Sequence, residues 1–206
     1  AGQFSIGAMV TLRQLEQHPG LAHYTQGAVA QALQPIVGVQ FRNMATVGGS
    51  IWGRFGFSDV LTLFLALDAR VELYKGGVIP LEQFAAMPYD RDILVRVLIP
   101  KTSCRVAYEA MRIQRTALPV LTCAVAQVSG ETRAVIGARP GKAVVVRDTG
   151  SLLACGITDE GAAAFAGSVA AQVPMGSNSR GSAAYRTHLC RVLTRRATLK
   201  LGGITL

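Results

Sequence analysis

Apolar and polar residues alternate over short distances in the first hundred positions, which predicts many short elements rather than a few long ones. Residues 4–10 alternate in the manner of a strand, and Thr11 is a candidate N-cap for a helix that Pro19 and Gly20 would end. Further along, residues 38–50 are polar and rich in glycine, and we expect an ordered loop there. The other expected elements of this part are helices over residues 12–17, 25–34, 60–67 and 81–86 and a strand over residues 70–74.

One of these helices leaves almost no polar surface. Ser58 is its candidate N-cap, and the residues from Val60 to Leu67 are nearly all apolar. Such a helix must be buried on nearly every side. The run is bracketed by Asp59 and Asp68 and is far shorter than the roughly 20 residues of a membrane span, so we expect a buried helix of a soluble domain.

From about residue 101 the order of the predicted elements changes. Residues 93–99 form the strongest strand pattern of the chain, and Pro100 stops it. Strands are expected next and helices only at the end, which is typical of an α+β chain. We therefore predict two domains, residues 1–100 and residues 101–206. The expected elements of the second are strands over residues 105–113, 122–128, 133–138 and 143–147 and helices over residues 160–173 and 182–200.

The charge is distributed unevenly. Residues 1–100 contain seven Lys and Arg against seven Asp and Glu, and residues 101–206 contain fourteen against five, so the formal net charge of +9 falls on the second half. A basic half can bind an acidic partner subunit, an anionic dinucleotide or nucleic acid. The basic residues are dispersed apart from Arg191, Arg195 and Arg196, and few aromatic residues lie between them, so we do not expect nucleic-acid binding.

The four cysteines and three histidines form no metal or catalytic signature. The sequence contains no CxxC pair of the kind that holds zinc or an iron–sulfur cluster. The histidines lie near no candidate nucleophile and no pair of carboxylates stands out, so any chemistry must come from a bound cofactor. The printed sequence starts without a secretory signal, and we expect a cytoplasmic location.

A glycine pair is the most informative local feature. Gly48 and Gly49 lie between Thr46 and Ser50, and the backbone N–H groups of such a turn can approach an anion closely because no Cβ intervenes. Neither a P-loop nor a Rossmann glycine pattern is present. Asp59 either favours the start of a helix through the helix dipole or accepts hydrogen bonds from a ribose. From the pattern alone, a tight turn and a phosphate site both stay open.

Several runs of residues together resemble a known family. The combination resembles the flavin-binding domain of the molybdenum hydroxylases, which include xanthine dehydrogenase and the medium subunit of aerobic carbon monoxide dehydrogenase. The last run is similar to the terminal helix of the family's flavoprotein C-terminal domain, so the resemblance covers nearly the whole chain. The runs are residues 40–50 (QFRNMATVGGS), 57–61 (FSDVL), 65–69 (LALDA) and 185–197 (YRTHLCRVLTRRA).

The resemblance implies a mixed sheet in a PCMH-like second FAD-binding subdomain, followed by an antiparallel sheet of three to four strands packed with helices. It also implies bound FAD, partner subunits that carry [2Fe–2S] clusters and molybdopterin, and electrons that pass through the FAD, usually to NAD. The site residues that it implies are Thr46, Val47, Gly48, Gly49 and Ser50 at the pyrophosphate, Asp59 at a ribose, Leu94 beside the flavin or adenine, and Ile36 against the cofactor.

The sequence departs from the family pattern in two places. Ser50 stands where the family commonly has Asn, and both residues can form local hydrogen bonds. The family also has an N-terminal subdomain with a second glycine-rich phosphate loop ahead of the strand expected at residues 4–10, and the printed sequence begins after it. Two functional hypotheses follow. The chain is the flavin-binding part of a molybdopterin-dependent dehydrogenase, or it is a non-catalytic assembly module that docks on the iron–sulfur and molybdenum subunits without binding FAD by itself.

Overall fold

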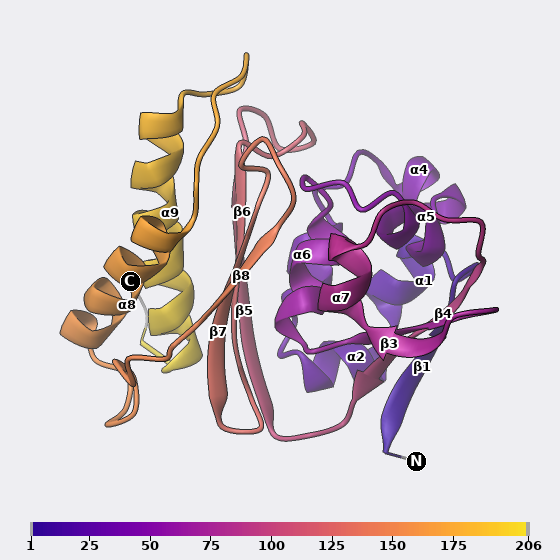
Figure 1. The fold of residues 1–206 in the computed structure, drawn as a ribbon, viewed down its shortest axis with the longest axis horizontal. Helices are drawn as coiled ribbons and strands as arrows, with labels where there is room; N and C mark the ends of the chain where they lie inside the picture. Colours follow the sequence, from indigo (N-terminus) through magenta and orange to yellow (C-terminus); the bar gives the residue numbers. More distant parts are fainter. Residues whose placement is uncertain (1, 205–206) are drawn as a thin grey trace.

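The computed structural model describes residues 2–204, in which helices and two antiparallel sheets are stacked in layers (Figure 1). The second sheet stands in the middle, with α8 (Asp159–Gln172) and α9 (Ala183–Leu201) on one face and the first half of the chain on the other. The first half contributes the other sheet and α6 (Asp59–Ala66), which packs against the central sheet. The prediction of an α+β fold is confirmed.

The first sheet has the strand order β1–β4–β2–β3, and each strand is antiparallel to its neighbours. The resemblance predicts a mixed sheet, but every neighbouring pair of strands in this sheet is antiparallel, because β4 lies between β1 and β2. Because β4 pairs antiparallel with both β1 and β2, those two strands run in the same direction without touching. The strands are β1 (Gln3–Gly7), β2 (Arg70–Leu73), β3 (Gly77–Pro80) and β4 (Leu94–Pro100).

Short helices fill much of the remaining first half, and some differ from the sequence prediction. The predicted helix over residues 12–17 ends before Pro19, as expected, but Pro19 also begins a second helix that was not predicted. Proline suits the first helical turn, and His18 Nδ1 accepts a hydrogen bond from Leu21 N at 3.1 Å. Residues 38–50 contain α4 and α5 rather than a loop, with the hydroxyl of Thr46 as the N-cap of α5. The helices are α1 (Leu12–Gln17), α2 (Pro19–Tyr24), α3 (Ala28–Leu33), α4 (Val39–Met44), α5 (Val47–Trp52) and α7 (Leu81–Ala86).

The central sheet has the order β5–β6–β7–β8 and is buried on both faces. Alternate side chains of a strand point to opposite faces. In β6 (Leu121–Val128), Ala124 and Ala126 accordingly belong to the core of the first half, whereas Cys123 and Val125 belong to the core beneath α8 and α9. The other strands are β5 (Cys104–Met111), β7 (Glu131–Gly137) and β8 (Val144–Arg147).

Helix α6 is buried along its whole length, as its sequence predicts. The hydroxyl of Ser58 caps it by accepting a hydrogen bond from Leu61 N at 3.2 Å. On the side that faces the central sheet, Thr62 Oγ1 and Thr122 Oγ1 lie 3.1 Å apart in a buried hydrogen bond. Apolar packing and this polar contact therefore hold α6 of the first half against the central sheet.

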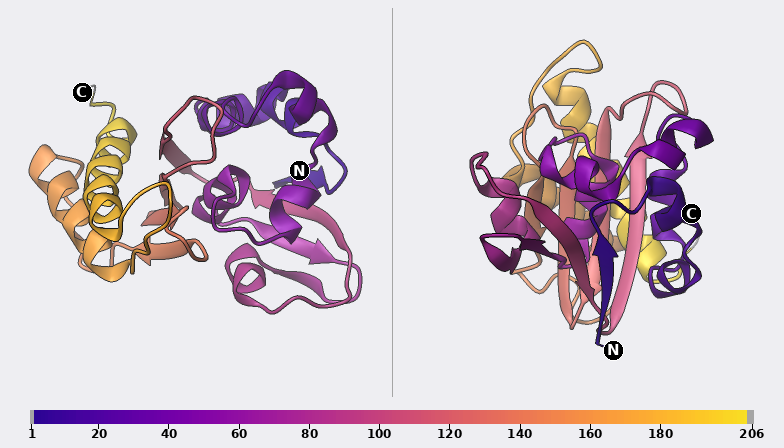
Figure 2. Two further views of the ribbon diagram at one scale, coloured as in Figure 1. Left: turned by 90° about the horizontal axis from the view of Figure 1, so that it is seen from above. Right: turned by 90° about the vertical axis from the view of Figure 1, so that its right-hand side faces the viewer.

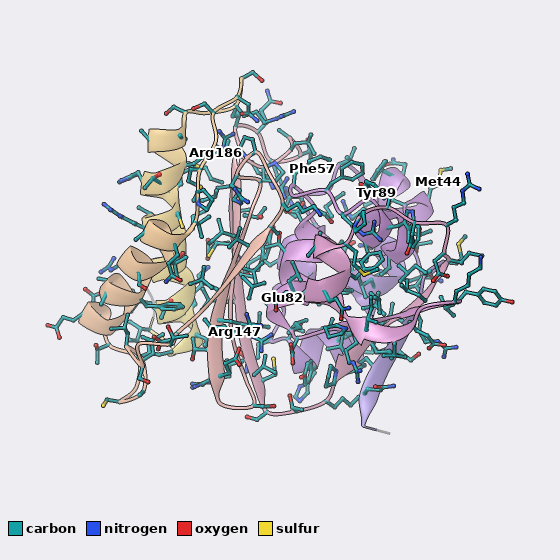
Figure 3. All side chains as sticks on the ribbon, viewed as in Figure 1. Met44, Phe57, Glu82, Tyr89, Arg147 and Arg186 are labelled. Atoms are coloured by element: carbon teal, nitrogen blue, oxygen red, sulfur yellow. The ribbon has the colours of Figure 1, made fainter. Side chains whose placement is uncertain are left out.

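A fully buried arginine organises the start of α9 (Figure 3). The Nε of Arg186 donates a hydrogen bond to the carbonyl of Val120 at 3.0 Å, and Nη1 donates to the carbonyl of Gly176 at 2.9 Å. Nη2 donates to Asn178 Oδ1 at 2.6 Å. Neutral oxygens thus surround this guanidinium, which connects the residue before β6 to the polar loop at residues 177–181.

Replacement of Arg186 by Met tests this connection. We expect the free energy of unfolding to fall by about 3 kcal/mol, because methionine cannot supply the hydrogen bonds and leaves several oxygens unpaired. Urea unfolding measures the change. Arg191→Met, at an exposed position of the same helix, is the control and should stay within about 0.5 kcal/mol of the wild type. Equal losses in the two variants would contradict this role of Arg186.

Candidate functional site

A cavity of 370 Å³ opens where α4, α5 and α6 meet the segments that connect them. Its volume lies near the lower end of the roughly 300–1,000 Å³ that is usual for small-molecule sites, so it has room for part of a dinucleotide. Residues from separate segments meet at its wall, which is mostly apolar. Among them are five of the eight residues named from the sequence, namely Ile36, Thr46, Gly49, Ser50 and Asp59.

The other three predicted residues do not line this cavity. Val47 and Gly48 are buried in the first turn of α5, and Leu94 is buried at the start of β4. Val47 and Leu94 belong to the apolar core of the first half. These three residues are therefore buried and do not form the cavity wall.

The two glycines of α5 have different surroundings. A Cβ on Gly48 would lie 2.8 Å from both the Cβ and the carbonyl oxygen of Ala8, which no real Cβ tolerates without a shift. A Cβ on Gly49 would meet only the hydroxyl of Thr46, at 3.4 Å, and Gly49 is exposed. Gly48 is thus required by the close approach of the chain after β1, whereas Gly49 leaves space at the cavity.

The backbone N–H groups of the glycine segment already have acceptors within the chain. The amides of Val47, Gly48, Gly49 and Ser50 donate, in that order, to the carbonyl of Val10 (2.9 Å), the carbonyl of Ala8 (2.8 Å), the hydroxyl of Thr46 (3.1 Å) and the carbonyl of Thr46 (3.1 Å). The sequence pattern leaves a tight turn and a phosphate site both open, and the structure shows the first turn of α5 at this segment. The Thr46 hydroxyl accepts from Gly49, so its own hydrogen is left to donate elsewhere.

The carboxylate of Asp59 lies both at the cavity and at the junction of the two halves. Its Oδ1 accepts hydrogen bonds from the hydroxyl of Tyr108 and from Arg112 Nη2, the latter at 2.5 Å. Burial raises the pKa of Asp59 above its ordinary value, and the facing Arg112 and Tyr108 oppose that shift. Oδ2 accepts no hydrogen bond from another of residues 2–204. One carboxylate oxygen is therefore committed to the fold, and the other can accept from a ligand.

Aromatic residues that the sequence analysis did not name form part of the wall. The rings of Phe55 and Phe57 are stacked, with centroids 5.2 Å apart and an angle of 10° between their planes. Leu118, from the connection between β5 and β6, lies at the same wall, and Phe57 is labelled in Figure 3. Flat apolar surfaces of this kind suit planar ring systems. The only sequence signal for them was the place of Phe57 beside the Ser-Asp motif.

A second cavity, of 280 Å³, shares Phe55, Phe57 and Leu118 with the first. Three cationic residues line it, Arg54, Lys142 and Arg180, and none of its described lining residues is acidic. The guanidinium of Arg54 is buried among aromatic rings and lies 4.0 Å from the centroid of Phe84. No motif of the sequence indicates these cations. Their charge favours an anionic group on any ligand that extends from the first cavity.

The described part of the chain holds neither a candidate metal site nor a membrane-spanning helix. No group of three or more His, Cys, Asp or Glu within residues 2–204 is arranged to hold a metal, and no helix there is long and apolar enough to cross a membrane. Burial raises the pKa of Cys190 to about 11, which favours the protonated thiol at neutral pH.

Family models account for both halves of the chain. Residues 1–102 match the FAD binding domain in molybdopterin dehydrogenase, and residues 106–201 match the CO dehydrogenase flavoprotein C-terminal domain. The chain belongs to the FAD-binding family of the molybdopterin dehydrogenases. The resemblance that the sequence motifs indicated is confirmed.

The curated relatives that match this family member are bacterial. The uncharacterized protein YgfM of Escherichia coli strain K12 is 32% identical over 125 residues, which is 61% of this chain and 46% of YgfM. YgfM of Escherichia coli O157:H7 matches to the same extent. The chain therefore spans about half the length of the curated relatives that it matches.

Solved structures share the fold of this family member. Reconstituted CO dehydrogenase from Oligotropha carboxidovorans has a TM-score of 0.87 at 22% identity, covering 100% of this chain and 77% of that chain. Quinoline 2-oxidoreductase from Pseudomonas putida 86 has a TM-score of 0.83 at 21% identity, covering 98% and 76%. CO dehydrogenase from Hydrogenophaga pseudoflava has a TM-score of 0.83 at 22% identity with the same coverage. At these identities the likeness establishes the fold.

Alanine substitutions at the two glycines of α5 should have opposite effects on stability. Gly48→Ala should lower the free energy of unfolding by about 2 kcal/mol, because the added Cβ collides with Ala8. Gly49→Ala should leave it unchanged or raise it by up to about 1 kcal/mol, because alanine is the better helix former and meets only an ordinary contact. Urea unfolding of the two variants checks both signs. A more stable Gly48→Ala variant would show that the contact with Ala8 is not restrictive.

Loss of the charge on Asp59 should destabilise the junction of the two halves. Asp59→Asn leaves the buried guanidinium of Arg112 without its counter-charge, and we expect a loss of about 3 kcal/mol. The double variant Asp59→Asn, Arg112→Met removes both charges and should recover part of that loss. Chemical unfolding of the single and double variants gives the comparison. If the loss in the double variant equals the sum of the losses in Asp59→Asn and Arg112→Met, the two groups are not coupled.

Proposed function

We propose that this chain is the FAD-binding component of a molybdopterin-dependent dehydrogenase and that the 370 Å³ cavity holds part of the FAD. The observation that carries the proposal is the meeting of Thr46, Gly49 and Asp59 at one mostly apolar cavity in a chain of this family. Hydroxyl and carboxylate groups suit the sugar and phosphate of a dinucleotide, and the apolar wall suits a ring. A bound FAD would supply the redox chemistry that the side chains lack.

Each residue at the cavity has its own part in this proposal. Asp59 Oδ2 accepts a hydrogen bond from a ribose hydroxyl, while the hydroxyl of Thr46 donates to a phosphate oxygen. Gly49 leaves room for the phosphate to come close, and Ser50, whose hydroxyl donates to the carbonyl of Thr46, lies at the same wall. Ile36 contacts a ring of the cofactor. Of the residues that do not form the wall, Val47 and Gly48 hold α5 in place, and Leu94 supports the ring from the core.

The wider enzyme is also part of the proposal. Electrons reach the FAD from the [2Fe–2S] clusters of a partner subunit and leave to NAD or another acceptor, as in an enzyme of the xanthine dehydrogenase or CO dehydrogenase type. A molybdopterin subunit chooses the substrate. The solved relatives support this arrangement, because they include Cu,Mo-CO dehydrogenase and quinoline 2-oxidoreductase. The complex would be a hetero-oligomer of the cytoplasm.

A second candidate function is favoured by the hydrogen bonds of the glycine segment. The amides of residues 47–50 all have acceptors within the chain, and the hydroxyl of Ser50 donates to the carbonyl of Thr46 at 3.1 Å, which leaves the hydroxyl of Thr46 as the donor for a diphosphate at this segment. A chain with few free donors can serve as an assembly module that docks on the iron–sulfur and molybdenum subunits without holding FAD by itself. FAD binding by the isolated chain discriminates between the two functions.

Titration of the chain with FAD, followed by flavin fluorescence, tests the proposal at one residue. Gly49→Leu should weaken FAD binding by about tenfold or more, because leucine occupies the cavity while remaining a good helix former. Gly167→Leu is the matched control. That glycine lies on α8, on the other side of the central sheet, and a Cβ there meets nothing within 4 Å, so FAD affinity should not change.

The outcomes separate the two candidate functions. Equal FAD affinity of Gly49→Leu and the wild type would show that the cofactor binds elsewhere. Absence of FAD binding by the folded wild-type chain, together with capture of an iron–sulfur or molybdopterin subunit, would favour the assembly module.

A further inference from the structure

A groove of 340 Å³ lies between α8 and α9. Figure 2 shows these two helices side by side at one side of the molecule. Helix α9 packs on β5 and β6, and α8 lies beside α9, so the central sheet separates both helices from the candidate FAD site. One wall of the groove is built from small residues of α8, and the other carries three arginines of α9. The lining residues include Ala163, Ala166 and Gly167 on the first wall and Arg191, Arg195 and Arg196 on the second.

The arginine wall carries positive charge that the chain does not fully neutralise. Arg191 lies four residues before Arg195 and five before Arg196, about one helical turn from each, so all three lie on the side of α9 that lines the groove. Arg195 pairs with Asp159 at the start of α8. Arg191 and Arg196 are exposed and form no ion pair with any residue between positions 2 and 204. Arg191, Arg195 and Arg196 are also clustered in the sequence, whereas the other basic residues of the second half are dispersed.

The α8 wall of the groove is formed by small residues, and no contact within the described part of the chain requires a glycine there. Gly167 lies in the middle of a 14-residue helix, where glycine is less favourable than alanine. A Cβ at this position would meet nothing within 4 Å, so packing inside the chain does not require glycine. Ala163 lies one turn earlier and is exposed. A body that packs closely against α8 from outside would make use of both residues.

We propose that this groove is the docking site for an acidic amphipathic helix of a protein partner. A helix in the groove would place its apolar side chains over Ala163 and Gly167 and its carboxylates beside Arg191 and Arg196. Arginine suits this task, because its planar guanidinium binds a carboxylate through two parallel hydrogen bonds. The pair between Arg195 and Asp159 already places a carboxylate on the same side of α9.

The composition of the groove favours a protein helix over nucleic acid. No aromatic side chain among its lining residues is available to stack on a base. The cations occupy one wall and small apolar residues the other, which matches the two faces of an amphipathic helix. A phosphate backbone would instead be followed by cations along both sides. The inference does not depend on FAD, because the groove and the candidate FAD site lie on opposite sides of the central sheet.

Nuclear magnetic resonance of the full ¹⁵N-labelled chain tests the proposal with defined probes. The first probe is a capped helical peptide of alanine and leucine with glutamate at every fourth position, and the second has lysine in place of each glutamate. The third is a short mixed-sequence DNA duplex. We expect the glutamate peptide to shift the amide signals of Ala163, Gly167, Arg191 and Arg196 in a saturable way, and the lysine peptide to leave them unchanged.

Two variants and a control connect this binding to the groove. Arg191→Glu with Arg196→Glu reverses the charge of one wall, and Gly167→Leu adds a large side chain to the other. Each should weaken binding of the glutamate peptide by about tenfold or more. Gly167→Leu should fold normally, since a Cβ at this position meets nothing within 4 Å. The control, Arg91→Glu with Arg115→Glu, makes the same charge change at two other exposed positions and should retain the wild-type affinity.

Three results would overturn the proposal. The first is the absence of shifts at the groove with millimolar glutamate peptide. The second is peptide binding that the control variant weakens as much as the groove variants do, because the attraction would then be unspecific. The third is tighter binding of the DNA duplex than of the peptide at the same residues, which would assign the groove to nucleic acid.

Discussion

The buried ion pair between Asp59 and Arg112 is the interaction on which the candidate site depends. Asp59 belongs to the first turn of α6, and Arg112 follows β5 directly, so the pair joins the two halves beside the cavity. Tyr108 donates to the same carboxylate oxygen. A buried pair of this kind adds little net stability, but neither partner can be left alone, so it fixes how the two elements meet. The wall that holds Ser58 and Asp59 therefore has one position relative to the central sheet.

The same constraint explains why a helix so apolar begins with an acid. From Val60 onwards the side chains of α6 are buried, and the apolar ones pack in the core between the first sheet and the central sheet. Asp59 is buried as well, yet its two oxygens differ, because Oδ1 accepts from residues of the second half and Oδ2 from none of the described neighbours. The fold thus uses one oxygen and leaves the other for a ligand. The two glycines of α5 differ in a similar way, because Gly48 makes a close contact with Ala8 and Gly49 borders open space.

Much of the fold could be predicted from periodicity and caps. The buried helix that Ser58 caps, the strands of the second half and the terminal helix lie close to their predicted positions, because each is long or strongly patterned. The six-residue helices α2, α4 and α5 were missed or misplaced. They depend on His18 and Thr46 as caps and on tertiary contacts such as that of Gly48 with Ala8, and none of these has an apolar period.

The candidate site was predictable only as far as local motifs reach. Thr46, Gly49 and Asp59 lie close in sequence, and the motif that contains them carried the family resemblance. Tyr108 and Arg112 lie about fifty positions from Asp59, and the pairing of β5 with β6, rather than any motif, brings them there. The groove between α8 and α9 is a second example. The sequence shows the cluster of arginines in α9, but it does not show the groove that they line.

A crystal structure of the chain grown with FAD measures the central claim most directly. The account predicts density for part of the cofactor in the cavity between α5 and α6, with a ribose hydroxyl within hydrogen-bond distance of Asp59 Oδ2 and the bond to Arg112 intact. Ordered cofactor at another surface, or an Asp59 that has left Arg112 to reach it, would contradict the account.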